Sequence, residues 1–140
     1  MSKIAIVYWS GTGNTQVMAK AIYDAAKDAG KDVEIFNVSE ISPQDASKYD
    51  VLALGCPSMG MENLEEDEFE PFFAGLENSI KDKSLALFGS YGWGDGQWMR
   101  DWIERAKKDG AILLDDQGLI VNETPDDEGI RLCKELASKL

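Results

Sequence analysis

A short loop rich in hydroxyl groups and glycines, YWSGTGNT at residues 8–15, is the first part of the sequence that could bind a ligand. It precedes a helical pattern, and the unpaired N–H groups and dipole of a helix N-terminus attract anions. Its glycines allow close backbone approach, and its hydroxyls can donate hydrogen bonds. The nearest cations are Lys3 and Lys20. The hydroxyl groups belong to Ser10, Thr12 and Thr15. The sequence of this loop therefore predicts a site for a phosphate group with no positively charged side chain beside it.

Three known phosphate-binding motifs do not fit this loop. A P-loop requires the pattern GxxxxGK[ST], and the missing lysine argues against hydrolysis of a nucleoside triphosphate. The dinucleotide fingerprint GxGxxG requires a third glycine at the position of Gln16. The Cys-x5-Arg loop of low-molecular-weight phosphatases fails because Glu62 stands six residues after Cys56. Two interpretations stay open, a site for one phosphate group or a capped turn that binds no ligand.

The elements that position this loop alternate between apolar strands and amphipathic helices. Strands are expected at residues 3–9, 32–38, 51–56, 84–90 and 112–121, the last interrupted at 115–118. Helices are expected at 14–29 with a stop at Gly30, at 69–76, at 98–106 with a stop at Gly110, and after a cap at Thr124 with Pro125 as first residue. Strands that are apolar on both faces favour an α/β doubly wound parallel sheet, here as a single domain over residues 1–140.

The first helix and the strand ends carry further expectations. The apolar face of that helix is predicted to contain Val17, Met18, Ala21, Ile22, Ala25, Ala26 and Ala29. Ligands of doubly wound sheets bind beyond the carboxyl ends of the strands. Four segments leave those ends, at residues 10–15, 57–67, 90–97 and 122–127, and they hold most of the unusual residues. The sequence therefore predicts one site at this edge.

Composition excludes several classes of function. The net charge of −12, from 26 acidic and 14 basic residues, argues against nucleic acid and anionic membranes as partners. A partner with a basic face fits this charge, and plain solubility also explains it. The chain has no histidine and its two cysteines form no CxxC motif, which argues against a zinc site or a Cys–His nucleophile. Without a signal peptide or an apolar run of about 18 residues, we expect a cytoplasmic protein.

Four segments together resemble the flavodoxin family. The family signature [ST]-x-T-G-[NK]-T is matched by residues 10–15, and the resemblance extends to CPSMGME at 56–62 and GSYGWGDG at 89–96. The acidic stretch EEDEFEPFF at 65–73 looks like the short-chain, clostridial type, and the fifth strand lacks the insertion of about 20 residues that marks long-chain members. The resemblance covers the whole chain.

The resemblance implies a low-potential electron carrier, not an enzyme, that holds FMN non-covalently. It implies a flavodoxin-like five-stranded parallel sheet of order 2-1-3-4-5 with helices on both faces. The FMN-binding residues at matching positions are Ser10, Gly11, Thr12, Gly13, Asn14 and Thr15 for the phosphate, then Pro57, Ser58, Met59, Gly60, Met61 and Glu62, and finally Ser90, Tyr91, Gly92, Trp93 and Gly94. Asn122 and Glu123 match the family more loosely, so no role is assigned to them.

Individual roles follow from the same resemblance. Met59 and Trp93 match the positions that flank the two faces of the flavin ring, and Glu62 matches the acceptor for its N3–H group. Gly60 would sit in a type II′ turn, where its carbonyl turns to accept a hydrogen bond from N5 of the reduced flavin. Met61 departs from the small or polar residue of many relatives, so the resemblance does not fix the energy of this turn.

Acidic residues dominate residues 62–70, which contain six acids and no base. A charge about 10 Å from the ring contributes roughly 0.4 kcal/mol in water, so six contribute about 2 kcal/mol, on the order of 100 mV for one electron. The acids should therefore help to make reduced flavin a strong reductant. They should also steer docking to redox partners with basic faces, such as ferredoxin-type oxidoreductases. A monomer is expected.

Two other functions were weighed against the carrier. A small FMN-dependent NAD(P)H:quinone reductase would share the fold, but such enzymes usually carry longer loops, and no histidine or lone base lies in the site segments. A receiver domain of the same topology needs acidic residues after the first and third strands, where Trp9-Ser10 and Gly55-Cys56 stand. Both alternatives rank below the carrier.

Overall fold

The computed structural model describes residues 2–140 and contains a six-stranded parallel sheet. Its strands are β1 (Lys3–Tyr8), β2 (Asp32–Asn37), β3 (Val51–Gly55), β4 (Ser84–Tyr91), β5 (Ile112–Leu113) and β6 (Leu119–Asn122). The order is β2-β1-β3-β4-β5, and β6 pairs with the far half of β4. The predicted fold class and strand order are confirmed. The interrupted fifth strand corresponds to β5 and β6, which pair with β4 one after the other along its length.

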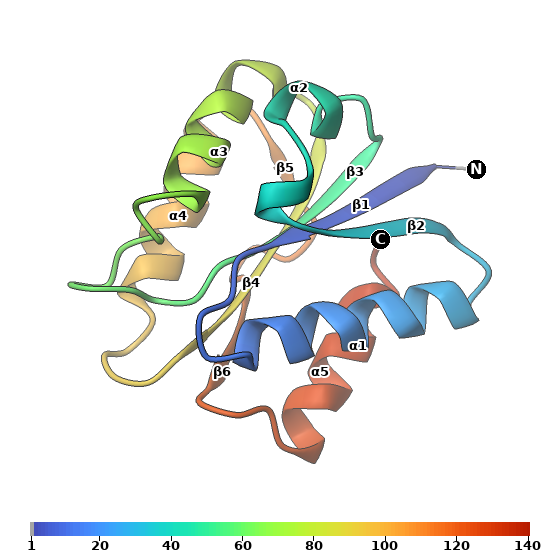
Figure 1. The fold of residues 1–140 in the computed structure, drawn as a ribbon. Helices are drawn as coiled ribbons and strands as arrows, with labels where there is room; N and C mark the ends of the chain where they lie inside the picture. Colours follow the sequence, from blue (N-terminus) through green and yellow to red (C-terminus); the bar gives the residue numbers. More distant parts are fainter. Residues whose placement is uncertain (1) are drawn as a thin grey trace.

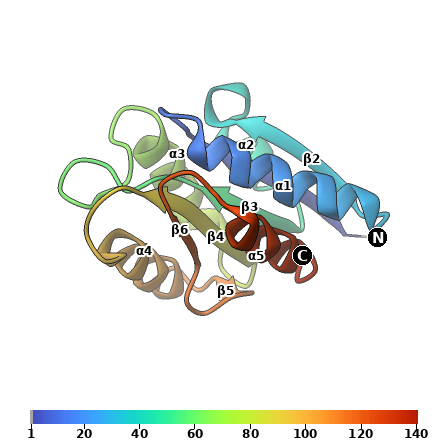
Figure 2. The same ribbon diagram turned by 90° about the horizontal axis from the view of Figure 1, so that it is seen from below.

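Helices cover both faces of this sheet (Figure 1). They are α1 (Asn14–Asp28), α2 (Pro43–Ala46), α3 (Phe69–Leu76), α4 (Gln97–Lys108) and α5 (Asp127–Ala137), with short 3₁₀ turns η1 (Val38–Glu40) and η2 (Glu77–Ser79). α1 and α5 pack together on one face, and α2, α3 and α4 cover the other. The loops after β1, β3 and β4 gather at one end of the sheet (Figure 2). The topology thus brings the expected site segments together.

Apolar side chains on both faces of the strands explain why the sheet is buried. On one face Ile4, Ile6 and Ala53 pack against α1 and α5, and on the other Leu52 and Leu54 pack against α3 and α4. Trp98 and Trp102, four residues apart and therefore on one side of α4, are both buried. Each fully buried Leu or Ile side chain contributes about 2 kcal/mol. The sheet therefore forms a rigid support for the loops at its carboxyl edge.

Three local expectations were wrong. α5 begins after an Asp126 cap, whose side chain accepts from the Gly129 N–H at 2.8 Å, so Thr124 is not the cap and Pro125 precedes the helix. The second strand ends at Asn37 because Asn37 caps η1, which begins at Val38. Val17 is 44% exposed, since the buried face of α1 uses Ala19 instead. In each case a residue one or two positions away took the role, cap or buried position, that the sequence pattern had assigned to its neighbour.

A charged cluster joins α3 to α4. The Arg105 guanidinium bonds Glu70 at 2.6 Å and Glu77 at 2.7 Å, and it lies 4.9 Å from the centre of the Phe73 ring. Arg105 lowers the pKa of Glu77 through these hydrogen bonds. Burial and the neighbouring Glu77 carboxylate raise the pKa of Asp109 to about 6. Asp109 therefore favours the folded state only while it is protonated.

This cluster predicts a pH-dependent stability. The folded pKa of Asp109 lies above its ordinary value of 3.8, so the stability it contributes is complete below about pH 4 and is lost as the pH rises through 6. Asp109→Asn should raise the melting temperature by a few degrees at pH 7.5, given that about 1 kcal/mol corresponds to roughly 4 °C in such domains. Thermal unfolding at pH 4 should show almost no gain. Asp24→Asn, an exposed change on α1, is the control; an equal gain at both pH values would contradict the assignment.

Candidate functional site

A cavity of about 440 Å³ opens at the carboxyl edge of the sheet, where the four expected segments meet. This volume is typical of small-molecule sites, which span roughly 300–1,000 Å³. The segments that follow β1, β3, β4 and β6 all contribute to it. Its lining residues are Trp9, Gly11, Thr12, Asn14, Pro57, Ser58, Met59, Ser90, Tyr91, Gly92, Glu123 and Thr124.

The loop before α1 is shaped to receive an anion. Gly13 has a φ of +99°, a conformation that suits glycine, and α1 has no acidic residue in its first turn. The Ser10 Oγ accepts hydrogen bonds from the N–H groups of Gly13 at 3.1 Å and Gln16 at 3.3 Å. A hydroxyl that accepts twice keeps its own proton free to donate. Ser10 therefore shapes the loop and still offers a donor.

Thr15 differs from the other hydroxyl residues of this loop because it is completely buried. Its Oγ1 lies 3.0 Å from the Ser90 Oγ and accepts from the Ser90 N–H at 3.3 Å. It is not among the residues that line the cavity. The structure therefore shows Thr15 joining the first loop to the end of β4.

The segment after β3 forms a wider turn than expected. Met59 and Asn63 exchange two backbone hydrogen bonds of 2.8 Å, which leaves three residues between them instead of the two of a type II′ turn. Gly60 has the expected positive φ, +53°, and Glu62 has a φ of +58°. The φ of Gly60 is the one that the expected type II′ turn requires at its first central position, and the backbone pairing closes at Asn63, one residue beyond that turn. Gly60 nevertheless adopts a conformation that other residues reach only with strain.

Two features of the cavity wall indicate a ligand with polar and flat apolar parts. The Ser58 Oγ is buried and has no hydrogen-bond partner among residues 2–140. Such a group costs about 1–3 kcal/mol unless a ligand or water satisfies it. Met59, which lines the cavity, is 37% exposed, and in the adjoining loops Trp93 is 61% and Met61 86% exposed. These groups fit a phosphorylated flavin, because they offer polar donors at one end and apolar side chains at the other.

Glu62 bridges two of the site loops. Its Oε1 accepts from the Gln97 N–H at 3.1 Å, at the N-terminus of α4. It also packs against Gly94, where an added Cβ would lie 2.5 Å from the carboxylate. Besides Thr15, seven residues expected at the site do not line this cavity: Ser10, Gly13, Gly60, Met61, Glu62, Trp93 and Gly94. They belong to the same three loops, after β1, β3 and β4, as residues that do line it.

Three lining residues, Trp9, Glu123 and Thr124, were not assigned from the sequence, and side-chain contacts hold Trp9 and Thr124 in place. The Trp9 indole packs over Gly11 and donates from Nε1 to the Glu68 Oε1 at 3.2 Å. The Thr124 hydroxyl donates to the Asn14 Oδ1 at 3.2 Å. Trp9 follows the first strand directly, and this position was the only available signal. Their partners are 59 and 110 residues away, so local patterns do not reveal the contacts.

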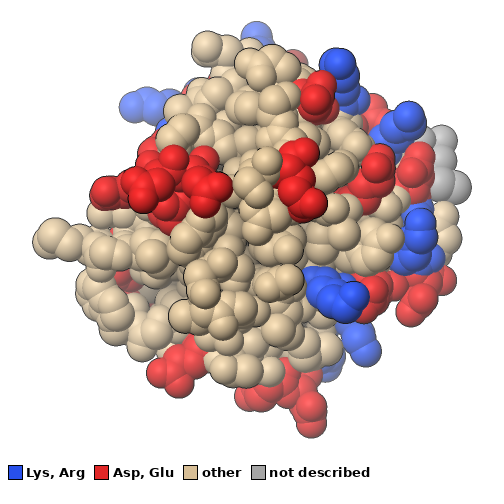
Figure 3. Space-filling view, viewed as in Figure 1, with Lys and Arg blue, Asp and Glu red and all other residues tan. Residues whose placement is uncertain are grey.

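The acids of residues 62–70 gather where α3 begins (Figure 3). Glu65 is only 7% exposed, and this burial opposes ionisation of its carboxyl group. The carboxylate accepts hydrogen bonds of 2.8 Å from the N–H groups of Asp67, Glu68 and Phe69. Together these bonds outweigh the effect of burial and lower the pKa of Glu65. Arg105 forms an ion pair with Glu70 and neutralises it, so this acid no longer adds to the negative charge of residues 62–70. The four other acids have no ion-pair partner among residues 2–140. They are Glu62, Glu66, Asp67 and Glu68, and we call them the acidic group.

Residues 2–140 contain neither a membrane-spanning helix nor a metal-binding cluster. No helix there is long and apolar enough to cross a membrane. No group of three or more acidic or cysteine side chains there is arranged to hold a metal ion.

Comparison with known proteins gives a consistent result. The family model described as Flavodoxin matches residues 6–135. The chain is 47% identical over 135 residues to a flavodoxin of Clostridium beijerinckii, covering 96% of each chain. It is 48% identical over 133 residues to a flavodoxin of Megasphaera elsdenii, covering 95% of this chain and 94% of the other. The solution structure of two-electron reduced M. elsdenii flavodoxin superposes with a TM-score of 0.87 at 46% identity, covering 98% of this chain and 99% of that chain.

With two threonines of the first loop, contact with the ligand and structural support of the loop can be tested separately. Thr15→Val should lower the free energy of unfolding by about 1–3 kcal/mol, because it leaves the buried Ser90 groups unpaired. Thr12→Val, at an exposed position, should leave stability unchanged but weaken ligand binding. Urea unfolding of ligand-free protein and FMN titration by fluorescence measure the two effects. Equal loss of stability in both variants would refute this division of roles.

Proposed function

This chain belongs to the flavodoxin family, and we propose that the 440 Å³ cavity at the carboxyl edge of its sheet is where it holds FMN. Flavodoxins are FMN-bound electron carriers, and this chain carries electrons on non-covalently bound FMN. The observation that supports the position is the convergence of a helix N-terminus, free hydroxyls and the unpartnered Ser58 Oγ in one cavity. The reductase alternative is not favoured, since the two relatives with 47% and 48% identity, each matched over at least 94% of both chains, are flavodoxins.

In this proposal the first loop holds the phosphate with neutral donors. The hydroxyls of Ser10 and Thr12 and the side chain of Asn14 donate to it, together with N–H groups at the start of α1. Gly11 and Gly13 allow the backbone to approach, and Thr15 fixes the loop to β4. Without a cation the phosphate keeps its full negative charge, which disfavours further negative charge nearby.

The loops after β3 and β4 hold the ring. Met59 and Trp93 would cover its two faces, and Pro57, Ser58 and Met61 belong to the same loop after β3 as Met59. Glu62 accepts from the ring, and the backbones of Ser90, Tyr91, Gly92 and Gly94 surround its polar end. Stacking on an aromatic residue contributes on the order of 1 kcal/mol beyond the burial of surface. Bound FMN supplies the ability to accept and release electrons one at a time.

The chain's charges set the direction in which its potentials shift. Glu65 stays ionised, and the acidic group adds four charges on the same side of the molecule. Each acid opposes the addition of negative charge by roughly 0.4 kcal/mol at about 10 Å. The protein therefore favours a strongly reducing carrier, and it exerts this effect through the field of its acids and not through a catalytic group.

Gly60 gives this proposal a direct test. We propose that its carbonyl accepts a hydrogen bond from the reduced flavin, which requires a backbone conformation that glycine reaches freely. Gly60→Ala should make the first one-electron midpoint potential more negative, because alanine is strained by about 1–2 kcal/mol at positive φ. A spectroscopic redox titration measures this. A first potential equal to that of the wild type would refute the role of Gly60.

The acidic group also defines the surface that partners meet. The loops that hold Met61 and Trp93, two exposed apolar side chains, meet where Glu62 packs against Gly94, so apolar surface and negative charge occur in the same loops. We propose that monomeric protein docks here onto basic faces of ferredoxin-type oxidoreductases. A cytoplasmic location suits the two buried thiols, Cys56 and Cys133, which pack on opposite faces of the sheet and cannot pair with each other.

Salt dependence tests the docking surface. The rate of electron transfer from a ferredoxin-type reductase should fall as ionic strength rises, because screening weakens long-range attraction. Glu66→Gln should lower the association rate severalfold at low salt and leave the midpoint potentials nearly unchanged. Asp24→Asn, which removes the same charge from α1 on the other face of the sheet, is the matched control. A rate independent of salt, or equal effects of the two changes, would refute docking at the acidic group.

A further inference from the structure

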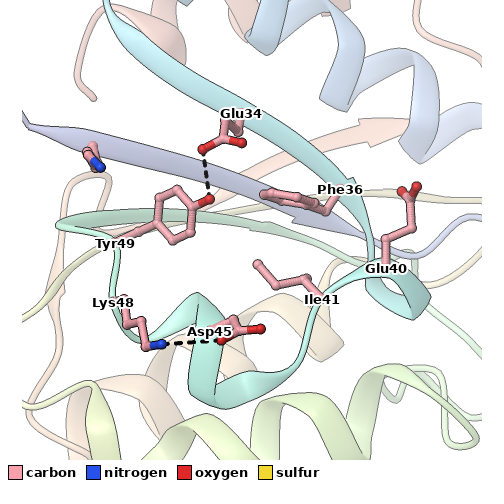
Figure 4. A pocket seen from close by; sticks show the side chains of 8 residues that line it. Glu34, Phe36, Glu40, Ile41, Asp45, Lys48 and Tyr49 are labelled. Carbon is pink, nitrogen blue, oxygen red and sulfur yellow. Dashed lines mark hydrogen bonds and ion pairs between the residues drawn. The ribbon is translucent and has the colours of Figure 1, made fainter.

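A second hollow lies between β2 and α2, away from the flavin cavity (Figure 4). It measures about 410 Å³ and shares no lining residue with that cavity. α2 is a single turn of four residues, so this part of the sheet face lacks the cover that longer helices provide elsewhere. We call it the β2 groove. Its lining residues are Lys3, Glu34, Phe36, Glu40, Ile41, Asp45, Lys48 and Tyr49.

The floor of the β2 groove is apolar and only half-buried. The rings of Phe36 and Tyr49 meet edge to face, with their centres 6.2 Å apart at an angle of 71°. Ile41 lies beside Phe36 in the same hollow (Figure 4). A ligand with an apolar body would remove this surface from water, which is favourable at about 25 cal/mol per Å².

Two carboxylates flank this floor without an ion-pair partner among residues 2–140. The Glu34 Oε1 accepts from the Tyr49 hydroxyl at 2.8 Å, and the Glu40 Oε1 accepts from the Asn37 N–H at 2.7 Å. Both donors are neutral, so neither hydrogen bond is an ion pair. Phe36 lies between Glu34 and Glu40 in Figure 4. This part of the groove therefore attracts a cation beside an aromatic ring.

The remaining charges of the groove do not cancel that attraction. Lys48 is paired with Asp45 at 3.5 Å, and in Figure 4 both lie on the α2 side, away from Glu40. Lys3 is the second cation, so three carboxylates face two ammonium groups. Burial and the bond to Glu34 raise the pKa of Tyr49 to about 12, so its hydroxyl donates at every physiological pH. The second oxygen of Glu34 stays available to a ligand.

We propose that the β2 groove binds an amphiphilic organic cation, an ammonium or guanidinium group carried on an aromatic or branched apolar body. The body packs against Phe36, Ile41 and Tyr49, and the cation lies near the carboxylates of Glu34 and Glu40. Apolar burial and charge attraction then act on one molecule. An anion of the same shape meets repulsion, and a neutral analogue loses the charged contact.

The proposal can be tested on FMN-loaded, ¹⁵N-labelled protein with 2-phenylethylammonium as the probe. Amide shifts of Glu34, Phe36, Ile41 and Tyr49 should saturate, whereas 2-phenylethanol and 3-phenylpropionate should bind at least about tenfold more weakly. Glu40→Gln keeps an acceptor for the Asn37 N–H but removes the charge, and it should raise the Kd about three- to tenfold. Phe36→Leu should raise it by a similar factor. Glu66→Gln, in the acidic group, is the matched control and should leave the Kd unchanged.

Three results would overturn the proposal. Shifts that rise linearly with the probe, or that fall mainly in residues 62–70, would indicate non-specific attraction to an acidic protein. Equal binding of the alcohol would remove the role of charge, and an unchanged Kd in Glu40→Gln would remove the role of that carboxylate. Because Phe36 is partly buried, circular dichroism must show that Phe36→Leu is folded; if it is not, Glu40→Gln and the probe series decide the question.

Discussion

The buried hydrogen bond between Thr15 and Ser90 is the contact on which the rest of the site depends. It joins residues 75 positions apart and places the anion-binding loop against the end of β4. A parallel sheet brings the carboxyl ends of its strands to one edge, but it does not fix the loops that follow them. Thr15 fixes the first loop, the pair of Met59 and Asn63 closes the turn after β3, and Glu62 links that turn to the start of α4. The cavity is the space that these three connections leave.

The effect of the acidic residues depends on where they lie and whether they are paired, and not only on how many there are. Arg105 neutralises Glu70 and Glu77 between α3 and α4, and the buried Glu65 serves to hold the first turn of α3. The four acids that are not paired among residues 2–140 belong to the segment between β3 and α3, which also holds the exposed Met61. In the function proposed above, the same field opposes added negative charge on the cofactor and attracts basic partners. A single cation in the first loop would weaken the first effect, which gives a physical reason for its absence there.

Trp9 contacts both the first loop and the acidic group. Its indole packs on Gly11 in the loop that receives the anion, and its N–H bonds Glu68 in the acidic group. A partner that draws Glu68 into an ion pair would compete for that bond. The β2 groove, by contrast, depends on the shortness of α2 and involves neither Trp9 nor the flavin cavity. The sheet thus supports two separate hollows, for which we propose opposite preferences, one for an anion and one for a cation.

The sequence by itself determined the strands, the helices, the parallel sheet and the edge at which the site lies. These features depend on local periodicity, on turn residues and on a contiguous motif at residues 10–15, all of which can be read along the chain. Only the tertiary structure decided that Thr15 supports the loop, that Trp9 and Thr124 line the cavity, that Arg105 removes one acid from the field, and that Asp126 caps α5. The first three depend on partners far apart in the sequence. The Asp126 cap is local, but Thr124 and Asp126 satisfy the same pattern, so packing had to choose between them.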